Sequence, residues 1–466
     1  MKLPRLLWNP DPQSRAKRLV RLLALAAVLC LLVPFIYWRL GLSRKIDSHL
    51  KTVRAAGDPV SAKELDAWYP QVSAEENAAL IYGRAFSRFV SPGNGRATPD
   101  YLKLKLPSRK EVVPQSLQLA IADALADNRE ALDLLHQAAR LKRSRYPISL
   151  TQGPNTLLPH LAPLKHAARL FELEVIEALE HGNADEAARS VRASTGLGRS
   201  LVAEPLLISQ LVRLSLNTAS CRSLERIMNR ARLTDRQLLD LNSALSETQN
   251  PAGFTRALVG ERAIGISLFT APLKDALAST PSGTSGRLET VAIDLFAPLI
   301  KASGFFERDQ IFYFETMQAY LGALSLPSPK SLETAKNVEG RIDEATAKYY
   351  IFSGMLLPGL RRGVQKDLES IALVRAAQTA LAIERFRLGH EDRLPDSLAA
   401  LVPGYLQSVP NDAFDASPLR YKRLSEGYVL YSIGADGTDD GGRERKEKTK
   451  HRDPEEPNDI TFIVER

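Results

Sequence analysis

The sequence predicts a mainly α-helical protein that one N-terminal helix anchors to a membrane, with a small α+β segment at the C-terminus. Leu, Ala and Ile recur three or four residues apart over most of the 466-residue chain, as on the buried face of an amphipathic helix. One long apolar run lies near the N-terminus, and short β-branched and aromatic runs gather near the C-terminus. We therefore expect a helical bundle or irregular helical array, followed by a long helix and an antiparallel sheet.

The apolar run Leu22–Trp38 is the expected membrane anchor, near the lower length limit for a spanning helix. Tyr37 and Trp38 end it, as aromatic residues at a membrane surface commonly do. No small-residue cleavage site follows, so we expect an uncleaved anchor in contact with the lipid bilayer. Basic residues precede the run and, from Arg39 on, also follow it; the preceding ones slightly favour a cytoplasmic N-terminus, and they are Lys2, Arg5, Arg15, Lys17, Arg18 and Arg21.

This orientation divides the chain into four expected parts. Residues 1–21 form a basic cytoplasmic N-terminus, and residues 22–40 form the transmembrane anchor in a bacterial inner membrane. Residues 41–363 form a helical periplasmic body, with a possible break at the Ser-, Gly- and Pro-rich stretch near 279–287. Residues 364–466 form a C-terminal module.

Five segments of the body have helical periodicity with charged residues on the opposite face. They are Val112–Arg140, His160–His181, Asp185–Val202, Pro205–Arg230 and Asp235–Glu247. The turn Glu180-His-Gly-Asn-Ala-Asp-Glu-Ala-Ala188 is similar to that of a tetratricopeptide hairpin, whose small residues allow close helix packing. No repeat of fixed period is visible, so a plain bundle is the simpler alternative to a repeat solenoid.

The C-terminal module is expected to contain one helix and three strands. Helical spacing from Val364 to Leu388 ends at Gly389, a common helix stop. The runs Pro418–Tyr421, Gly427–Gly434 and Asp459–Glu465 are rich in β-branched and aromatic residues. A small antiparallel meander is the expected arrangement.

An ordered series of short motifs runs through this module, and it resembles the C-terminal globular part of the type II secretion major pseudopilins. The motifs are Leu394-Pro-Asp-Ser-Leu398, Val402-Pro-Gly-Tyr-Leu406, Val409-Pro-Asn-Asp412, Pro418-Leu-Arg-Tyr421 and Tyr431-Ser-Ile-Gly-Ala-Asp-Gly-Thr-Asp-Asp-Gly-Gly442. The resemblance covers about the last fifth of the chain. It implies one long helix packed on a small sheet, and a secretion or envelope assembly as the cellular context. The prepilin pattern is absent from the N-terminus, so the chain is not itself expected to be a pilin.

The loop between Gly434 and Asn458 has no apolar run, and a loop of this length calls for a tether. Carboxylate oxygens and glycine turns suit Ca²⁺, which takes six to eight oxygen ligands. The resemblance implies calcium ligands at Asp436 and at the pair Asn458–Asp459, although Asn458 and the basic run Arg443–Arg452 depart from the family pattern. Calcium is the expected cofactor, the alternative is a turn that binds nothing, and the candidate ligands are Asp436, Asp439, Asp440, Asn458 and Asp459.

Charge and cysteine content exclude two simple interpretations. The net charge of +8 suggests nucleic acid, but the basic residues are scattered, and neither an RNA-recognition motif nor a zinc motif accompanies them. We expect no nucleic-acid partner. The two cysteines are Cys30, inside the expected membrane span, and Cys221, so no disulfide within the chain is expected.

The chain lacks the common catalytic motifs for nucleophiles, phosphate loops and zinc proteases. His160 and His166 are expected to be surface histidines of a helix, and Glu174 and Glu177 to be solvated charges on an amphipathic face. We expect a non-enzymatic scaffold or interaction protein with an unidentified protein partner. The alternative is a membrane-anchored enzyme with a site formed by scattered helical residues.

Overall fold

The computed structural model describes residues 12–90, 100–271, 302–326, 330–444 and 459–466. Helices make up 66% of the structure, and three short strands form one antiparallel sheet in the order β1-β2-β3. The predicted mainly α fold with a small sheet is therefore confirmed. The possible break near 279–287 and Asn458 lie outside the described residues.

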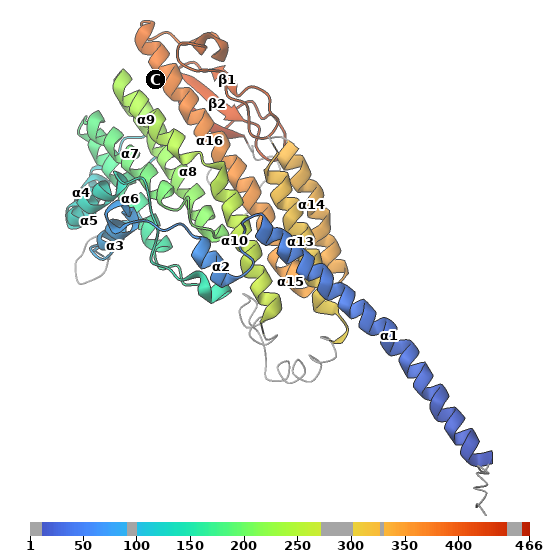
Figure 1. Cartoon of the computed structure of the whole chain (residues 1–466). Coiled ribbons are helices and arrows are strands. Elements are labelled where there is room, and N and C mark those ends of the chain that lie inside the picture. Colours follow the sequence, from blue (N-terminus) through green and yellow to red (C-terminus); the bar gives the residue numbers. More distant parts are fainter. Residues whose placement is uncertain (1–11, 91–99, 272–301, 327–329, 445–458) are drawn as a thin grey trace, which may run out of the picture.

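The helices and strands follow the chain as shown in Figure 1. The α-helices are α1 (Pro12–Ala55), α2 (Ala62–Trp68), α3 (Ala78–Phe86), α4 (Gln115–Asp127), α5 (Arg129–Ala139), α6 (Leu161–Glu180), α7 (Ala184–Ser200), α8 (Leu207–Arg230), α9 (Asp235–Thr248), α10 (Pro251–Thr270), α13 (Phe305–Leu324), α14 (Lys330–Ala347), α15 (Ile351–Leu356) and α16 (Pro358–Gly389). The 3₁₀ helices are η1 (Ala74–Glu76), η2 (Leu150–Asn155) and η3 (Leu398–Leu401), and the strands are β1 (Arg420–Arg423), β2 (Tyr428–Ser432) and β3 (Ile460–Val464).

The predicted helix over Val112–Arg140 is wrong as a single element, because Asn128 divides it into α4 and α5. The Asn128 amide nitrogen donates to the Ala124 carbonyl at 2.9 Å, and its side-chain oxygen accepts from the Val90 amide at 3.0 Å. These side-chain bonds compete with the helical backbone pattern, as Asn commonly does at helix ends. The other four predicted helices match α6 to α9 within a few residues.

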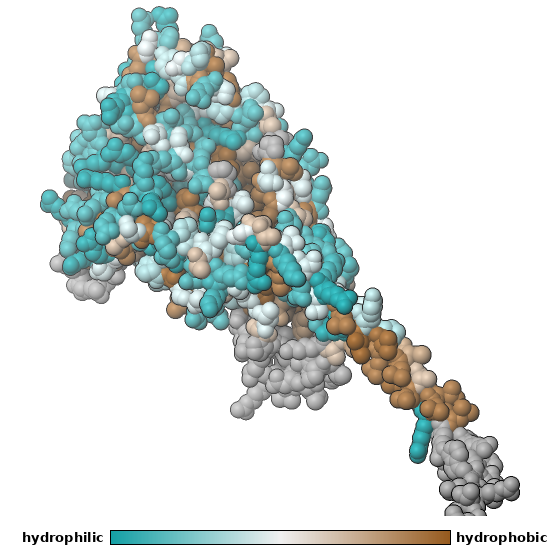
Figure 2. Space-filling model, viewed as in Figure 1, coloured by the Kyte–Doolittle hydropathy of each residue, from teal (hydrophilic) through white to brown (hydrophobic). Residues whose placement is uncertain are grey.

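Helix α1 extends from the body as one long rod (Figure 1). Its stretch from Leu19 is long and apolar enough to cross a membrane, with a mean hydropathy of 2.7 in the most apolar window, and its apolar surface is visible in Figure 2. The C-terminal part of α1 packs on α13. Arg39 pairs with Glu307 at 2.5 Å and Lys45 with Glu315 at 2.8 Å.

Helix α8 lies at the centre of the body and packs against α6, α7, α10 and α16. Polar side chains are buried along it together with apolar ones, so its amphipathic pattern is weak. Arg213 shows how the polar groups are satisfied. It donates to Gln210 at 2.6 Å and to the Thr248 carbonyl at 3.1 Å, and it lies 3.6 Å from Asp367.

The sheet packs on α16 with one face and is partly covered on the other. Leu430 and Phe462, which are paired across β2 and β3, belong to a hydrophobic core that also contains residues of α6 to α9 and α16. The segment 364–466 therefore shares its core with the helical body. Ile463 packs on the opposite face with Val429 and Tyr431, so β3 carries apolar side chains on both faces of the sheet.

Two side chains of α8 form hydrogen bonds with the outer edge of β3, which is the edge that does not pair with β2. Glu225 accepts a hydrogen bond from the Ile463 amide at 2.6 Å. Asn229 donates to the Ile463 carbonyl at 2.8 Å and accepts from the Glu465 amide at 2.8 Å. The two side chains thus satisfy backbone groups that a fourth strand would otherwise pair with.

Burial raises the pKa of Glu225 to about 7, against the lowering effects of the Ile463 amide and of Arg109. The folded state therefore binds this proton more tightly than the unfolded state, and the stability that Glu225 contributes is lost as pH rises through 7. Through this group, the free energy of unfolding of the wild type should fall by about 2 kcal/mol between pH 5.5 and pH 8. We predict that Glu225→Gln lacks this decrease. Denaturant unfolding at both pH values measures it. Glu426→Gln, at an exposed position, should leave the wild-type pH dependence unchanged, and an unaltered pH dependence in Glu225→Gln would contradict the assignment.

Candidate functional site

The expected calcium ligands that are described all lie in or beside the loop after β2. Asp436 accepts from the Thr438 amide at 3.2 Å, and Asp439 accepts from the Gly441 amide at 2.9 Å. Gly437, Gly441 and Gly442 all have positive φ angles, which residues with a Cβ atom rarely adopt. A Cβ atom on Gly442 would lie 2.8 Å from the Tyr431 ring. Glycine is therefore required at this point of the loop.

Asp459 enters the same region from the start of β3 and is only 4% exposed. One carboxylate oxygen accepts from the Gly442 amide at 2.8 Å, whereas the other is buried and has no hydrogen-bond partner among the described residues. Burial raises the pKa of Asp459, and the negative charges of Asp440 and Asp439 raise it further. A cation beside the unpaired oxygen would relieve both effects.

Two arginines already occupy part of this acidic surface. Arg420 lies 3.1 Å from Asp439, and Arg443 lies 3.0 Å from Asp440. Within the described ranges, no group of three or more His, Cys, Asp or Glu side chains is close enough to hold a metal ion. The chemistry of Asp459 fits a hard cation, and the calcium site stays a prediction.

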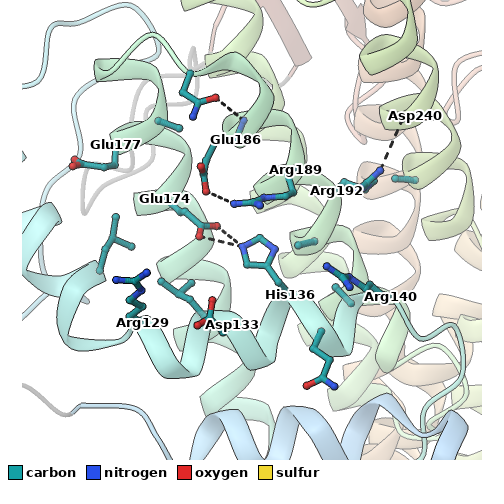
Figure 3. Close-up of a pocket in the computed structure, with 18 of the residues that line it drawn as sticks. Arg129, Asp133, His136, Arg140, Glu174, Glu177, Glu186, Arg189, Arg192 and Asp240 are labelled. Carbon is teal, nitrogen blue, oxygen red and sulfur yellow. Dashed lines mark hydrogen bonds and ion pairs between the residues drawn. The ribbon is translucent and has the colours of Figure 1, made fainter.

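A second and larger candidate is a groove on the helical body, with a volume of about 1180 Å³. Figure 3 shows that side chains of α5, α6 and α7 converge on it, with α9 at one side. On α5, Arg129, Asp133, His136 and Arg140 follow one another at helical spacing and so share a face. This groove was not predicted from the sequence. The spacing of these four charged and polar residues was the available signal.

His136 of α5 and Glu174 of α6 line the floor of the groove, and Ser190 of α7, which is buried beneath them, is hydrogen-bonded to Glu174. His136 Nε2 lies 2.9 Å from Glu174 Oε2, and Ser190 Oγ donates to the same oxygen at 2.5 Å. The side chains of His136 and Glu174 are only 16% and 14% exposed. The expectation that Glu174 is a solvated charge is therefore wrong, because α5 and α7 cover this face of α6.

The walls of the groove are charged and contain both signs in equal number. Arg199 and Lys142 hold Glu247 at 2.5 and 2.8 Å. Burial alone would raise the pKa of Glu247, but these two cations lower it overall. The cations are Arg129, Arg140, Lys142, Arg189, Arg192 and Arg199, and the acids are Asp133, Glu174, Glu177, Glu186, Asp240 and Glu247.

Arg129 and Arg140 differ from the other cations of the groove. Arg189 pairs with Glu186, and Arg192 lies 4.0 Å from Asp240 (Figure 3). Arg129 and Arg140 are exposed, and neither forms an ion pair within the part of the chain that the structure describes. Both guanidinium groups are therefore available to acidic groups of a ligand.

These three hydrogen-bonded side chains, His136, Glu174 and Ser190, do not form a nucleophilic relay. Ser190 is fully buried, and its hydroxyl donates to the Glu174 carboxylate and not to an imidazole. A serine nucleophile needs an accessible oxygen and a base that accepts its proton. The arrangement holds the three helices together, and of the three side chains His136 and Glu174 line the groove.

His160 was expected on a helix surface, and this expectation is wrong. Its Nε2 lies 3.1 Å from Glu204, and its ring stacks on Tyr146 with 4.0 Å between centroids. Ser209 donates to Glu204 at 2.5 Å. His160 and Glu204 are both buried, so this cluster joins helices inside the body and does not present a site to a ligand.

No protein-family model, curated protein or solved structure matches this chain. Its function is therefore inferred from the groove, the loop and the anchor helix.

We predict that Glu174→Ala destabilises the protein by about 1 to 3 kcal/mol, because Ser190 and His136 lose their shared buried acceptor. Glu177→Ala is the matched control on the same helix, because Glu177 lies 3.7 Å from the exposed His181. Its cost should stay below about 0.5 kcal/mol, as for a surface ion pair. Denaturant unfolding of both variants measures the difference. Equal costs would show that the hydrogen-bonded floor adds no stability.

Proposed function

We propose that the protein is a membrane-anchored interaction protein whose groove binds an acidic, extended segment of a partner protein. The observation that carries this proposal is the open charged groove with two cations, Arg129 and Arg140, that have no ion-pair partner among the described residues. The anchor helix α1 holds the body at the bacterial inner membrane, and the body lies on the periplasmic side.

The dimensions and chemistry of the groove support a peptide ligand over a small molecule. Small-molecule sites commonly enclose about 300 to 1000 Å³ and are mostly apolar with a few polar groups. The volume here is about 1180 Å³, and charged side chains make up half of the residues that line it. Arg129 and Arg140 lie eleven residues apart on α5, about 16 Å along the helix axis. That spacing suits two acidic residues on an extended chain.

A secretion or envelope assembly is the proposed cellular context. The motif series in residues 394–442 resembles the major pseudopilins, and the packing of the sheet on α16 is compatible with their arrangement of a long helix on a small sheet. A shared fold does not imply a shared function. The resemblance therefore supports the proposed cellular context more strongly than it supports a particular biochemical function.

An enzyme remains the alternative function, and the His136–Glu174 pair in the groove is the observation that favours it. A histidine oriented by a carboxylate is a common general base. Against it, the neighbouring hydroxyl of Ser190 is buried, and the lining charges are mostly paired with one another.

We predict that the double variant Arg129→Glu/Arg140→Glu loses partner binding by about tenfold or more, because two favourable charge pairs become repulsive. The measurement is photo-crosslinking in intact membranes from a benzoylphenylalanine placed at Gln137, an exposed position of α5 that lines the groove. A discrete adduct of the wild type should disappear in the double variant.

The matched control is Arg84→Glu/Lys422→Glu, which makes the same charge change at two exposed positions outside the groove. This control should keep the adduct. Loss of the adduct in both double variants would indicate an effect of net charge, and no adduct at Gln137 in the wild type would reject the groove as a binding site.

We also propose that calcium stabilises the loop after β2, with Asp459 as its central ligand and Asp436, Asp439 and Asp440 beside it. The buried, unpartnered oxygen of Asp459 supports this assignment. A bound ion would compete with Arg420 and Arg443 for the carboxylates of Asp439 and Asp440. Affinity in the range of extracellular sites, about 10⁻⁴ to 10⁻³ M, is therefore expected.

We predict that Asp459→Asn weakens calcium binding by the full-length protein, because it removes the charge of the least exposed ligand. Calorimetric titration with calcium measures the affinity, and at about tenfold excess over the dissociation constant the ion should stabilise the wild type by about 1 to 2 kcal/mol. Asp396→Asn is the control, because Asp396 is almost fully exposed and pairs with Arg423. Equal titrations of wild type and Asp459→Asn would place any calcium elsewhere.

A further inference from the structure

The end of the body beside the anchor is fixed by contacts to Trp38, the last residue of the apolar run. A Cβ atom on Gly304 would lie 2.7 Å from the Trp38 ring, and the Arg308 guanidinium lies 5.9 Å from that ring. The next residue after Gly304, Phe305, has its ring centroid 6.1 Å from that of Tyr350. The turn between α14 and α15 is therefore close to the level at which α1 leaves the membrane.

Two large side chains at this turn expose apolar surface to solvent, which is energetically unfavourable. Tyr349 is 82% exposed and Ile351 is 41% exposed. Tyr349 also has a φ angle of +57°, where it ends α14, and the amide of Tyr350 donates to the Ala345 carbonyl at 2.9 Å. Glycine is the usual residue at this position of a helix end, because a Cβ atom disfavours the left-handed conformation. A large aromatic residue here is costly both in backbone conformation and in exposed surface.

We propose that the turn 348–351 is a second membrane contact, at which Tyr349 and Ile351 enter the lipid headgroup region. Tyrosine is enriched at this depth because its ring is apolar and its hydroxyl is polar. Lys348 lies at the same turn and pairs with Glu344 at 2.6 Å. Arg39, which pairs with Glu307, lies close to Gly304, and Arg308 lies over the Trp38 ring. Positive groups at this level suit a surface of anionic lipids.

The occupant of this turn is a lipid surface and not a protein, because Tyr350 of the turn contacts Phe305 and the adjacent Gly304 contacts Trp38, at the end of the exposed apolar run of α1. Both are at the same end of the molecule, and the ion pairs of α1 with α13 keep them together. The inference rests on the proposed membrane anchoring. Two contacts instead of one would stop the body from rotating about α1 and would hold the groove at a fixed height above the bilayer.

Fluorescence quenching in vesicles tests this contact with the full-length chain. The native Cys30 carries the probe in the apolar run, and Cys221 stays unlabelled because it is buried and its pKa is raised to about 12. Further probes are placed at Tyr349→Cys, at Ile351→Cys and at Leu388→Cys, each in a Cys30→Ser background. Leu388 is 50% exposed near the far end of α16, whose 32 residues span about 48 Å.

The vesicles contain phosphatidylcholine and phosphatidylglycerol with spin-labelled lipid as the quencher. We expect the probe at Cys30 to be quenched, and the probes at 349 and 351 to be quenched about twofold or more above the probe at 388. Quenching at Cys30 but equal, weak quenching at 349, 351 and 388 would overturn the second contact and leave the anchor. No quenching at Cys30 would reject the anchor itself, and strong quenching at 388 would show that the body adsorbs without the proposed orientation.

Discussion

The fold depends on the burial of α8 on nearly all sides. A helix surrounded by α6, α7, α10 and α16 cannot keep a polar face in water, so its polar groups must be paired within the body. Arg213 with Gln210 and Asp367, and Glu225 and Asn229 with β3, provide this pairing. The same helix therefore contributes to two hydrophobic cores, one with the groove helices α5, α6 and α7 and one with α16 and the sheet.

The charged groove lies where this packing leaves charged faces of the helices uncovered. Helices α5, α6 and α7 bury their apolar faces together, and their charged faces meet in the groove. Salt bridges within the groove hold the charged side chains of its walls in place, because a paired side chain cannot rotate freely across the groove opening. Arg129 and Arg140 are exposed at the two ends of the α5 face that carries His136, so neither has to break an ion pair with a described residue to bind a ligand.

Local sequence patterns could predict the long helices and the three strands, because helical and alternating periodicity are properties of neighbouring residues. The division at Asn128 could not be predicted in this way, since it depends on a hydrogen bond from Val90. The groove was missed for the same reason: His136 and Glu174 are 38 residues apart and meet only after α5 packs on α6. The loop carboxylates were identified from their spacing. The burial of Asp459 could not be predicted in this way, because it depends on the pairing of β3 with β2.

The closed edge of β3 limits how copies of this protein can assemble. Sheets commonly grow between molecules when an edge strand offers free amide and carbonyl groups. On one side Glu225 and Asn229 already occupy those groups, and on the other side β1 carries Lys422 and Arg423, whose charges oppose strand addition. Growth of the sheet by edge-to-edge strand addition is thus opposed at both described edges, which favours contacts between copies of this protein through other surfaces.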